Sequence, residues 1–274
     1  MKGIPLSATT LATLCVALAA NAAAPTPAEN RLPRLSPWQS SRATPFVSLA
    51  TDAGFIYLRP RLTLGYGAPF WSFVGLDAHW LTTNSFTQPY IGWRASLPFL
   101  DVQTGVRAVY PFDRQEMPQR ASHDVSEIHL SDGGRRSTYH AADLDVTLLA
   151  PVLHGAAFIN THPFYVDAPR DIHLYEEVSR AIIEPPFAVY NRVGYVYDFG
   201  GALKFKGGAM LEYVVTPGRP KNVTRAGPVV LCSFDKNLDG LFTFSTVLDS
   251  PDELGIVHGT YAFIGVLHRM ATRF

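Results

Sequence analysis

From residue 44 to the end of the chain, apolar and polar residues alternate in short segments that are separated by Gly, Pro, Asn and Asp. The clearest segment is Ala202–Val215. Its apolar face carries Leu203, Phe205, Leu211 and Tyr213, and its polar face carries Lys204, Lys206 and Glu212. A period of two puts successive side chains on opposite faces of a β-strand. The pattern therefore predicts an all-β fold built from consecutive strands.

Twelve such segments can be counted, and the first of them is the weakest: Phe46–Thr51, Phe55–Gly65, Trp71–Leu81, Tyr90–Phe99, Val102–Phe112, Ser137–Pro151, Ala156–Val166, Ala188–Phe199, Ala202–Val215, Ala226–Phe234, Leu241–Leu248 and Gly259–Phe274. Short links such as Pro98–Asp101 alternate with long ones such as Asp113–Arg136. That alternation is typical of an up-and-down antiparallel barrel that crosses a membrane, with short turns on the periplasmic side. Both ends lie on that side only if the strand count is even. We therefore expect twelve strands, with ten as the alternative.

One stretch, residues 171–184, departs from the alternation. Ile172, Tyr175, Val178 and Ile182 follow a near-helical spacing, and Pro185 and Pro186 would end a helix there. We expect a short amphipathic helix in a long outer loop. It would pack on the rim as a cap, and the alternative is a plug folded into the lumen.

The N-terminal residues 1–24 have the features of a cleavable secretory signal. Lys2 precedes an apolar stretch, and Ala20-Asn21-Ala22 and Ala22-Ala23-Ala24 are both small-x-small cleavage candidates. Residues 25–43, rich in Pro, Ser and Arg, are expected to be an unstructured periplasmic lead-in, followed by the barrel at 44–274. Beyond the signal no apolar run is long enough to predict a membrane-spanning helix.

The last strand ends in Phe274, with Met270, Val266 and Ile264 on the same face. This pattern resembles the C-terminal strand of Gram-negative outer-membrane β-barrel proteins, although His268 interrupts the apolar face and Thr272 replaces an aromatic residue. The resemblance implies an outer-membrane location and Phe274 as the assembly signal. The implied partners are outer-membrane lipid and the barrel-assembly machinery.

If the apolar faces meet lipid, the polar faces line a lumen. The residues expected there are Arg59, Arg61, Asp77, His79, Arg94, Arg107, Asp143, Asp145, Arg192, Asp198, Lys204, Lys206 and Glu212. Both signs of charge are present, which fits a salt-bridged interior that stabilises the barrel. It also fits a polar path that selects small solutes. A soluble barrel would reverse the two faces and point its apolar residues inward.

Composition and motifs narrow the function further. A formal net charge of zero and 17% charged residues argue against a nucleic-acid partner. Asp235–Gly240 resembles the start of a calcium loop, but the glutamate expected at its twelfth position is absent, so a tight turn is favoured. His123 and Ser126 could form a hydrolytic pair, although no orienting partner is apparent.

We therefore predict no catalytic residues, metal ligands or cofactor. The expected function is a small-solute channel or a structural envelope barrel. The alternatives are an outer-membrane lipid hydrolase and a soluble secreted barrel that binds a small ligand.

Overall fold

The computed structural model describes residues 43–55, 57–112, 116–124, 127, 138–200, 204–253 and 260–274. The expected signal sequence, 1–24, and residues 25–42 of the expected lead-in lie outside the described residues, so both remain predictions. Among the described residues, no helix is long and apolar enough to cross a bilayer.

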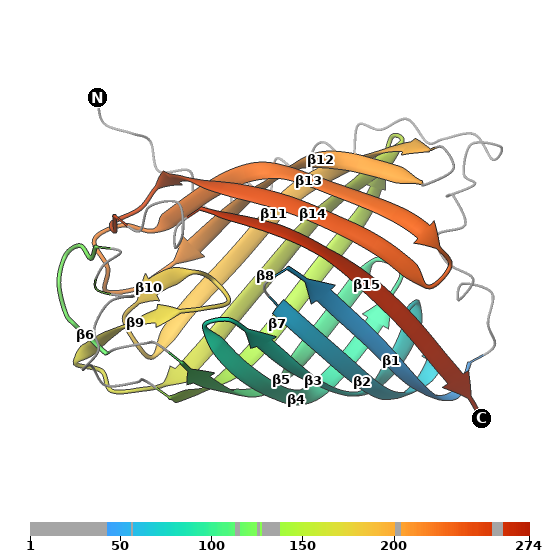
Figure 1. The fold of residues 1–274 in the computed structure, drawn as a ribbon, viewed down its shortest axis with the longest axis horizontal. Helices are drawn as coiled ribbons and strands as arrows, with labels where there is room; N and C mark the ends of the chain where they lie inside the picture. The colour runs from blue at the N-terminus through green and yellow to red at the C-terminus, as the bar shows by residue number, and fades with distance from the viewer. Residues whose placement is uncertain are drawn as a thin grey trace.

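Within these ranges, twelve antiparallel strands form one closed barrel (Figure 1). They are β1 (Thr44–Gly54), β2 (Tyr57–Ala68), β3 (Ser72–Thr83), β4 (Phe86–Leu97), β5 (Leu100–Pro111), β7 (Tyr139–Val152), β8 (Gly155–Asp167), β11 (Phe187–Gly200), β12 (Phe205–Val215), β13 (Val223–Asp235), β14 (Leu238–Asp249) and β15 (Tyr261–Arg273). Each strand pairs with its neighbours in the chain. The ring closes between β1 and β15, from the pair Phe46 and Arg273 to the pair Gly54 and Gly265. The predicted fold class and the count of twelve strands are confirmed.

Both ends of the barrel lie at the same rim, where the Phe274 N–H donates to the Pro45 carbonyl at 3.1 Å. We call this the terminal rim and the opposite one the loop rim. Links at the terminal rim span at most four residues: 69–71, 98–99, 153–154, 201–204 and 236–237. The loop rim carries the long links 112–138, 168–186, 216–222 and 250–260. Two other loop-rim links, 55–56 and 84–85, are short, so the predicted alternation of link lengths holds only for the second half of the barrel.

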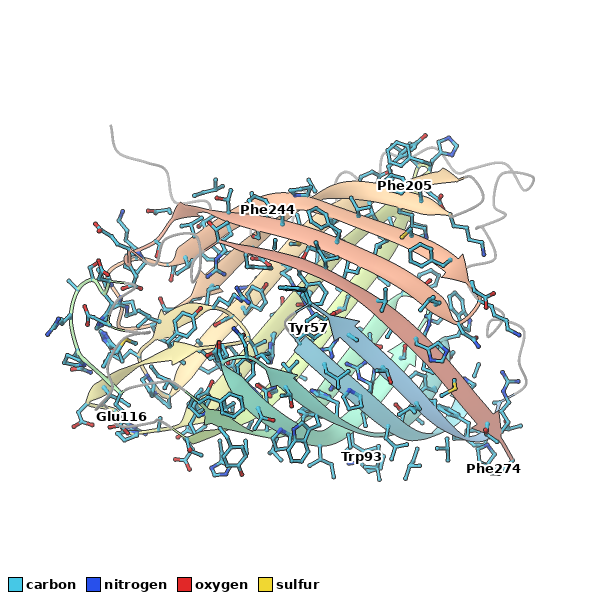
Figure 2. The ribbon with its side chains drawn as sticks, in the orientation of Figure 1. Tyr57, Trp93, Glu116, Phe205, Phe244 and Phe274 are labelled. Carbon is cyan, nitrogen blue, oxygen red and sulfur yellow. The ribbon has the colours of Figure 1, made fainter. Side chains whose placement is uncertain are left out.

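The outer surface of the barrel is apolar. Large side chains that alternate along the strands are exposed there, including Leu62, Leu64, Ile91, Trp93, Val106 and Ile264. Figure 2 shows Trp93 and Phe205 projecting from the outside of the ring. On the inside, Asp77 and Glu212 are fully buried although they are charged. A soluble barrel has the opposite distribution, so the apolar face is the one that meets a nonaqueous medium.

The expected helix at 171–184 is wrong. Residues Ile172–Glu176 form strand β9 and Ala181–Ile183 form strand β10, and the two pair as an antiparallel hairpin. A further short strand, β6 (Met117–Pro118), pairs with β9. Arg180 adopts a φ of 48° in the turn between β9 and β10, a conformation that interrupts a right-handed helix. The residues of β10 are all buried, so the spacing of apolar residues here reflects enclosure on several sides.

The assignment of faces leads to a first prediction, at Ala209, an exposed residue near the middle of β12. Ala209→Arg places a cation in the apolar surface and should cost about 2–4 kcal/mol of barrel stability. Lys206→Ala, on the inner face of the same strand, should leave a folded barrel. Folding is measured by the migration of unboiled protein on a gel.

A labelling experiment separates a membrane barrel from a soluble one. In a chain whose own cysteines are replaced, Leu211→Cys should react with a lipid-soluble probe, and Lys206→Cys should react with a water-soluble reagent. The opposite labelling pattern would show that the outer face of β12 meets water.

Candidate functional site: a charged lumen crossed by a hairpin

The first charged group of the interior is centred on Arg107 of β5. Its Nε donates to Asp143 at 2.8 Å, and its Nη1 donates to Glu176 of the hairpin at 2.7 Å. His162 of β8 lies 3.1 Å from Asp143, and the Tyr139 hydroxyl donates to Glu176. Arg107 retains only 2% exposure of its side chain. A buried cation is tolerated when carboxylates compensate its charge, and here Asp143 and Glu176 do so.

The second group is centred on Glu212 of β12, which accepts hydrogen bonds from three hydroxyls. Tyr190 of β11 and Tyr261 of β15 donate to Oε1, and Ser245 of β14 donates to Oε2 at 2.9 Å. Arg225 of β13 supplies the counter-charge at 3.8 Å. One carboxylate therefore ties together five consecutive strands from inside the barrel.

The hairpin connects these two groups across the lumen. Glu176, before the turn, contacts Arg107 on β5, whereas the backbone carbonyls of Ser179 and Arg180, in the turn, accept hydrogen bonds from Arg225 on β13. The Arg180 guanidinium also lies over the Tyr261 ring, 5.1 Å from its centroid.

Five positions separate β13 from β5 around the ring of twelve strands, so the hairpin spans nearly opposite walls. Figure 1 shows β9 and β10 within the ring, toward the end opposite the C-terminus. The expectation of a rim cap is therefore corrected to the alternative, a segment folded into the lumen. The expectation failed because a buried carboxylate and buried backbone carbonyls find their partners only on the inner walls.

Solvent reaches several ion pairs of the interior that the hairpin does not contact. Arg59 with Asp52, Arg61 with Asp77, and Arg94 with Asp101 form ion pairs on β1 to β5. The three arginine side chains keep 35, 20 and 22% of their exposure, compared with 2% for Arg107 and 1% for Arg225. The Lys206–Asp198 pair on β11 and β12 and the Arg269–Asp239 pair on β14 and β15 keep comparable exposure. The interior thus has a part buried against the hairpin and a remainder lined by ion pairs that solvent reaches.

A tyrosine and two glycines shape the inner surface of β4 and β5. Gly92 of β4 faces Gly105 of β5, and the Tyr90 hydroxyl lies over both. A Cβ atom at Gly92 would lie 2.2 Å from that oxygen, so a larger residue would displace the tyrosine. The His79 ring stacks on Tyr90 with centroids 4.5 Å apart. The two glycines therefore allow an aromatic pair to lie flat against the wall.

Most of the other residues predicted for the lumen form two smaller groups. Arg192 donates to Asn160 at 3.0 Å, and Asn160 in turn donates to Asp145 at 2.6 Å. Asp198 and Lys206 form an ion pair at 3.8 Å near the terminal rim. Lys204 is the exception, because it lies exposed in a turn with a φ of 44° and precedes the first residue of β12. Its expected place on the lumen face is corrected.

Sequence reasoning missed several charged residues that lie at strand ends. Asp52 follows the predicted segment Phe46–Thr51, and Arg225 precedes the segment that was expected to begin at Ala226. Both continue the polar alternation of their strands, so extending each segment by one residue would have found them. Glu176 carries no such signal, since its partner Arg107 lies 69 residues away in the chain.

The candidate chemical motifs form structural contacts. Lys236 and Asn237 form the tight β13–β14 turn, and Asp239 accepts hydrogen bonds from Arg269 and Ser233, as the turn interpretation predicted. In the described part of the chain, no group of acidic, histidine and cysteine residues could hold a metal ion. Ser126 lies outside the described residues, so the His123–Ser126 pair is not described. The ring nitrogens of His123 contact Glu127 and His173.

These features define a class of protein: a transmembrane β-barrel, with an apolar outer surface, a charged interior and no open sheet edge around its ring. No known protein family matches the sequence, and no curated protein matches it. Among solved structures, the KdgM porin is similar at 9% identity with a TM-score of 0.40, covering 81% of this chain and 98% of that one. The NanC porin is similar at 9% identity with a TM-score of 0.35, covering 84% and 99%.

OmpT of Vibrio cholerae is similar at 9% identity with a TM-score of 0.38, covering 83% of this chain and 97% of that protein. At such identities and scores, the likeness does not assign this chain to the family of any of these proteins.

Proposed function

We propose that this protein is an outer-membrane channel for small polar solutes, in which the β9–β10 hairpin narrows the lumen. The observation that carries this proposal is the division of the interior. Ion pairs that solvent reaches line β1–β2, β4–β5 and β11–β12, whereas the hairpin crosses the lumen between β5 and β13. Ion pairs that solvent reaches contribute little to stability, so their presence in the interior favours a conducting role over a purely structural one.

The outer-membrane location follows from the same fold. Only helices and closed barrels can satisfy every backbone hydrogen bond in lipid, and the apolar surface of this ring matches the hydrocarbon layer. The expected N-terminal signal and the C-terminal strand that resembles barrel assembly signals support export and assembly in that membrane. Outer-membrane lipid and the assembly machinery are the corresponding partners, and Phe274 is the residue that the machinery would recognise.

A pair of variants tests conduction past the ion pairs that solvent reaches. Arg59→Ala removes a cation and leaves Asp52 as an uncompensated anion, so the channel should shift toward cation preference. Asp52→Ala should shift the preference toward anions by the converse argument. The reversal potential in planar bilayers under a salt gradient measures both shifts, and the two must be opposite in sign.

The alternatives give different results in the same preparation. A folded barrel that carries no current at any voltage would indicate a structural envelope protein. Release of fatty acid from phospholipid vesicles by the purified protein would indicate a lipid hydrolase.

A further inference from the structure

Near the loop rim, one cluster of side chains joins the long links to the hairpin. His123 comes from link 112–138, His173 from β9, Arg219 from link 216–222 and Asp252 from link 250–260. We call these four residues the latch. All four are buried. The Arg219 guanidinium and the backbone N–H of His123 both donate to the Asp252 carboxylate. The latch thus fixes the outer end of the hairpin to three other segments of the rim.

The hydrogen bonds define which nitrogens of the latch carry protons. His173 Nδ1 lies 3.0 Å from Arg219 Nη1, 2.8 Å from His123 Nε2 and 3.4 Å from the Arg120 N–H. A guanidinium and a backbone N–H can only donate, so His173 Nδ1 is an acceptor and carries no proton. His173 is therefore neutral in the latch.

His123 supplies a third contact to the same nitrogen. Its Nε2 lies against the acceptor nitrogen of His173, and its Nδ1 lies 2.9 Å from the Glu127 carboxylate. The latch therefore directs a guanidinium, a backbone N–H and a second imidazole at the unprotonated nitrogen of His173, and a proton on that nitrogen would break these contacts.

We propose that the latch is an acid-sensitive fastening, in which protonation of His173 removes its acceptor nitrogen and releases the outer end of the β9–β10 hairpin. Release weakens the attachment of the segment that crosses the lumen. The effect on conduction rests on the proposed channel function, whereas the release itself does not.

The charges around His173 determine the direction of the response. Burial, Arg219 and His123 lower the pKa of His173 from 6.5 to about 4. A released His173 regains its ordinary pKa, so it binds a proton more tightly than the latched one. Below about pH 6.5, each unit of acidification therefore favours release about tenfold, and the effect levels off near pH 4.

Two carboxylates face the same cluster and respond in different senses. The hydrogen bond from His123 lowers the pKa of Glu127, so acid weakens that contact and acts in the same direction as His173. Burial raises the pKa of Asp252, so its proton uptake favours the closed latch and opposes release. The test must therefore isolate the contribution of His173.

Amide hydrogen exchange of the protein in lipid nanodiscs provides the measurement. Between about pH 7.5 and pH 5, exchange of residues 172–183, corrected for the intrinsic rate at each pH, should accelerate about thirtyfold. Barrel strand β12 should show no such change. His173→Gln cannot take up the proton and should reduce the acid response sharply, because only Glu127 and Asp252, which act in opposite senses, remain. His140→Gln, which alters an exposed histidine on β7, should retain it.

Corrected exchange that is flat with pH in the natural protein overturns the proposal, and so does an unchanged acid response in His173→Gln. Current recordings of the same preparation separate the two proposals. Acid-dependent exchange in a barrel that never conducts supports the latch and refutes the channel.

Discussion

Replacing Glu212 with alanine is expected to lower the free energy of unfolding of the barrel by about 3–5 kcal/mol. The carboxylate is fully buried, and its removal leaves three hydroxyls without their acceptor and Arg225 without its counter-charge. The penalty arises from desolvated groups that lose their partners. Reversible denaturation in lipid vesicles, followed by tryptophan fluorescence, measures the change.

A matched variant controls for the loss of a charge as such. Asp101→Ala also removes a carboxylate from an ion pair, the one with Arg94, but solvent reaches both side chains. Its cost should stay within about 1 kcal/mol. Equal losses of unfolding free energy in Glu212→Ala and Asp101→Ala would contradict the distinction between buried charges and charges that solvent reaches.

The second large effect is expected at Glu176, which attaches the hairpin to strand β5. Glu176→Ala removes the partner of Arg107 and the acceptor of the Ser179 N–H, which lies 2.6 Å away. The Arg107 guanidinium keeps its hydrogen bond to Asp143, so the barrel should remain folded. The hairpin, however, loses its hydrogen bond to β5. The single-channel conductance should then increase severalfold.

The control for this prediction is Glu253→Ala, which changes an exposed acidic residue at the loop rim outside the lumen contacts. Its conductance should equal that of the natural protein. If Glu176→Ala folds and conducts as the natural protein does, the hairpin is not the part of the lumen that limits flow.

The barrel could be predicted from the sequence because a strand between lipid and a wet interior has two chemically distinct faces. Leu62 and Leu64 alternate with Arg61 and Thr63 for this reason, and the register follows from the pairing of neighbouring strands. The weak first segment is needed for an even strand count, which places both ends at one rim. The closing pairs of β1 with β15 confirm that argument.

The hairpin could not be predicted in the same way. Its residues have protein on several sides, so no alternation of environment appears in the sequence, and Ile172, Tyr175 and Ile182 fell by chance at helical intervals. Its contacts are also distant along the chain, with a sequence separation of 46 between Arg225 and Ser179. Local periodicity reports the environment of a strand, whereas the partners of a buried charge depend on the closed ring.

The latch illustrates the same limit for candidate chemistry. The sequence drew attention to His123 beside Ser126 as a possible hydrolytic pair. In the structure, the partners of His123 are Glu127, four residues along the chain, and His173, 50 residues away. Neither sequence separation belongs to a recognised catalytic motif. The contacts of this histidine depend on three other segments of the fold, so they could not be inferred from the sequence.

The attachment of the hairpin to two walls also bears on the order in which the chain assembles. Arg107 on β5 and Tyr139 on β7 precede the hairpin in the chain, so Glu176 can contact both residues once β5 and β7 have paired. Arg225 and Tyr261 follow it and reach the turn only as the last strands join the ring. A growing sheet would therefore carry the hairpin on one wall, and the final strands would meet an internal template that already holds part of their inner surface.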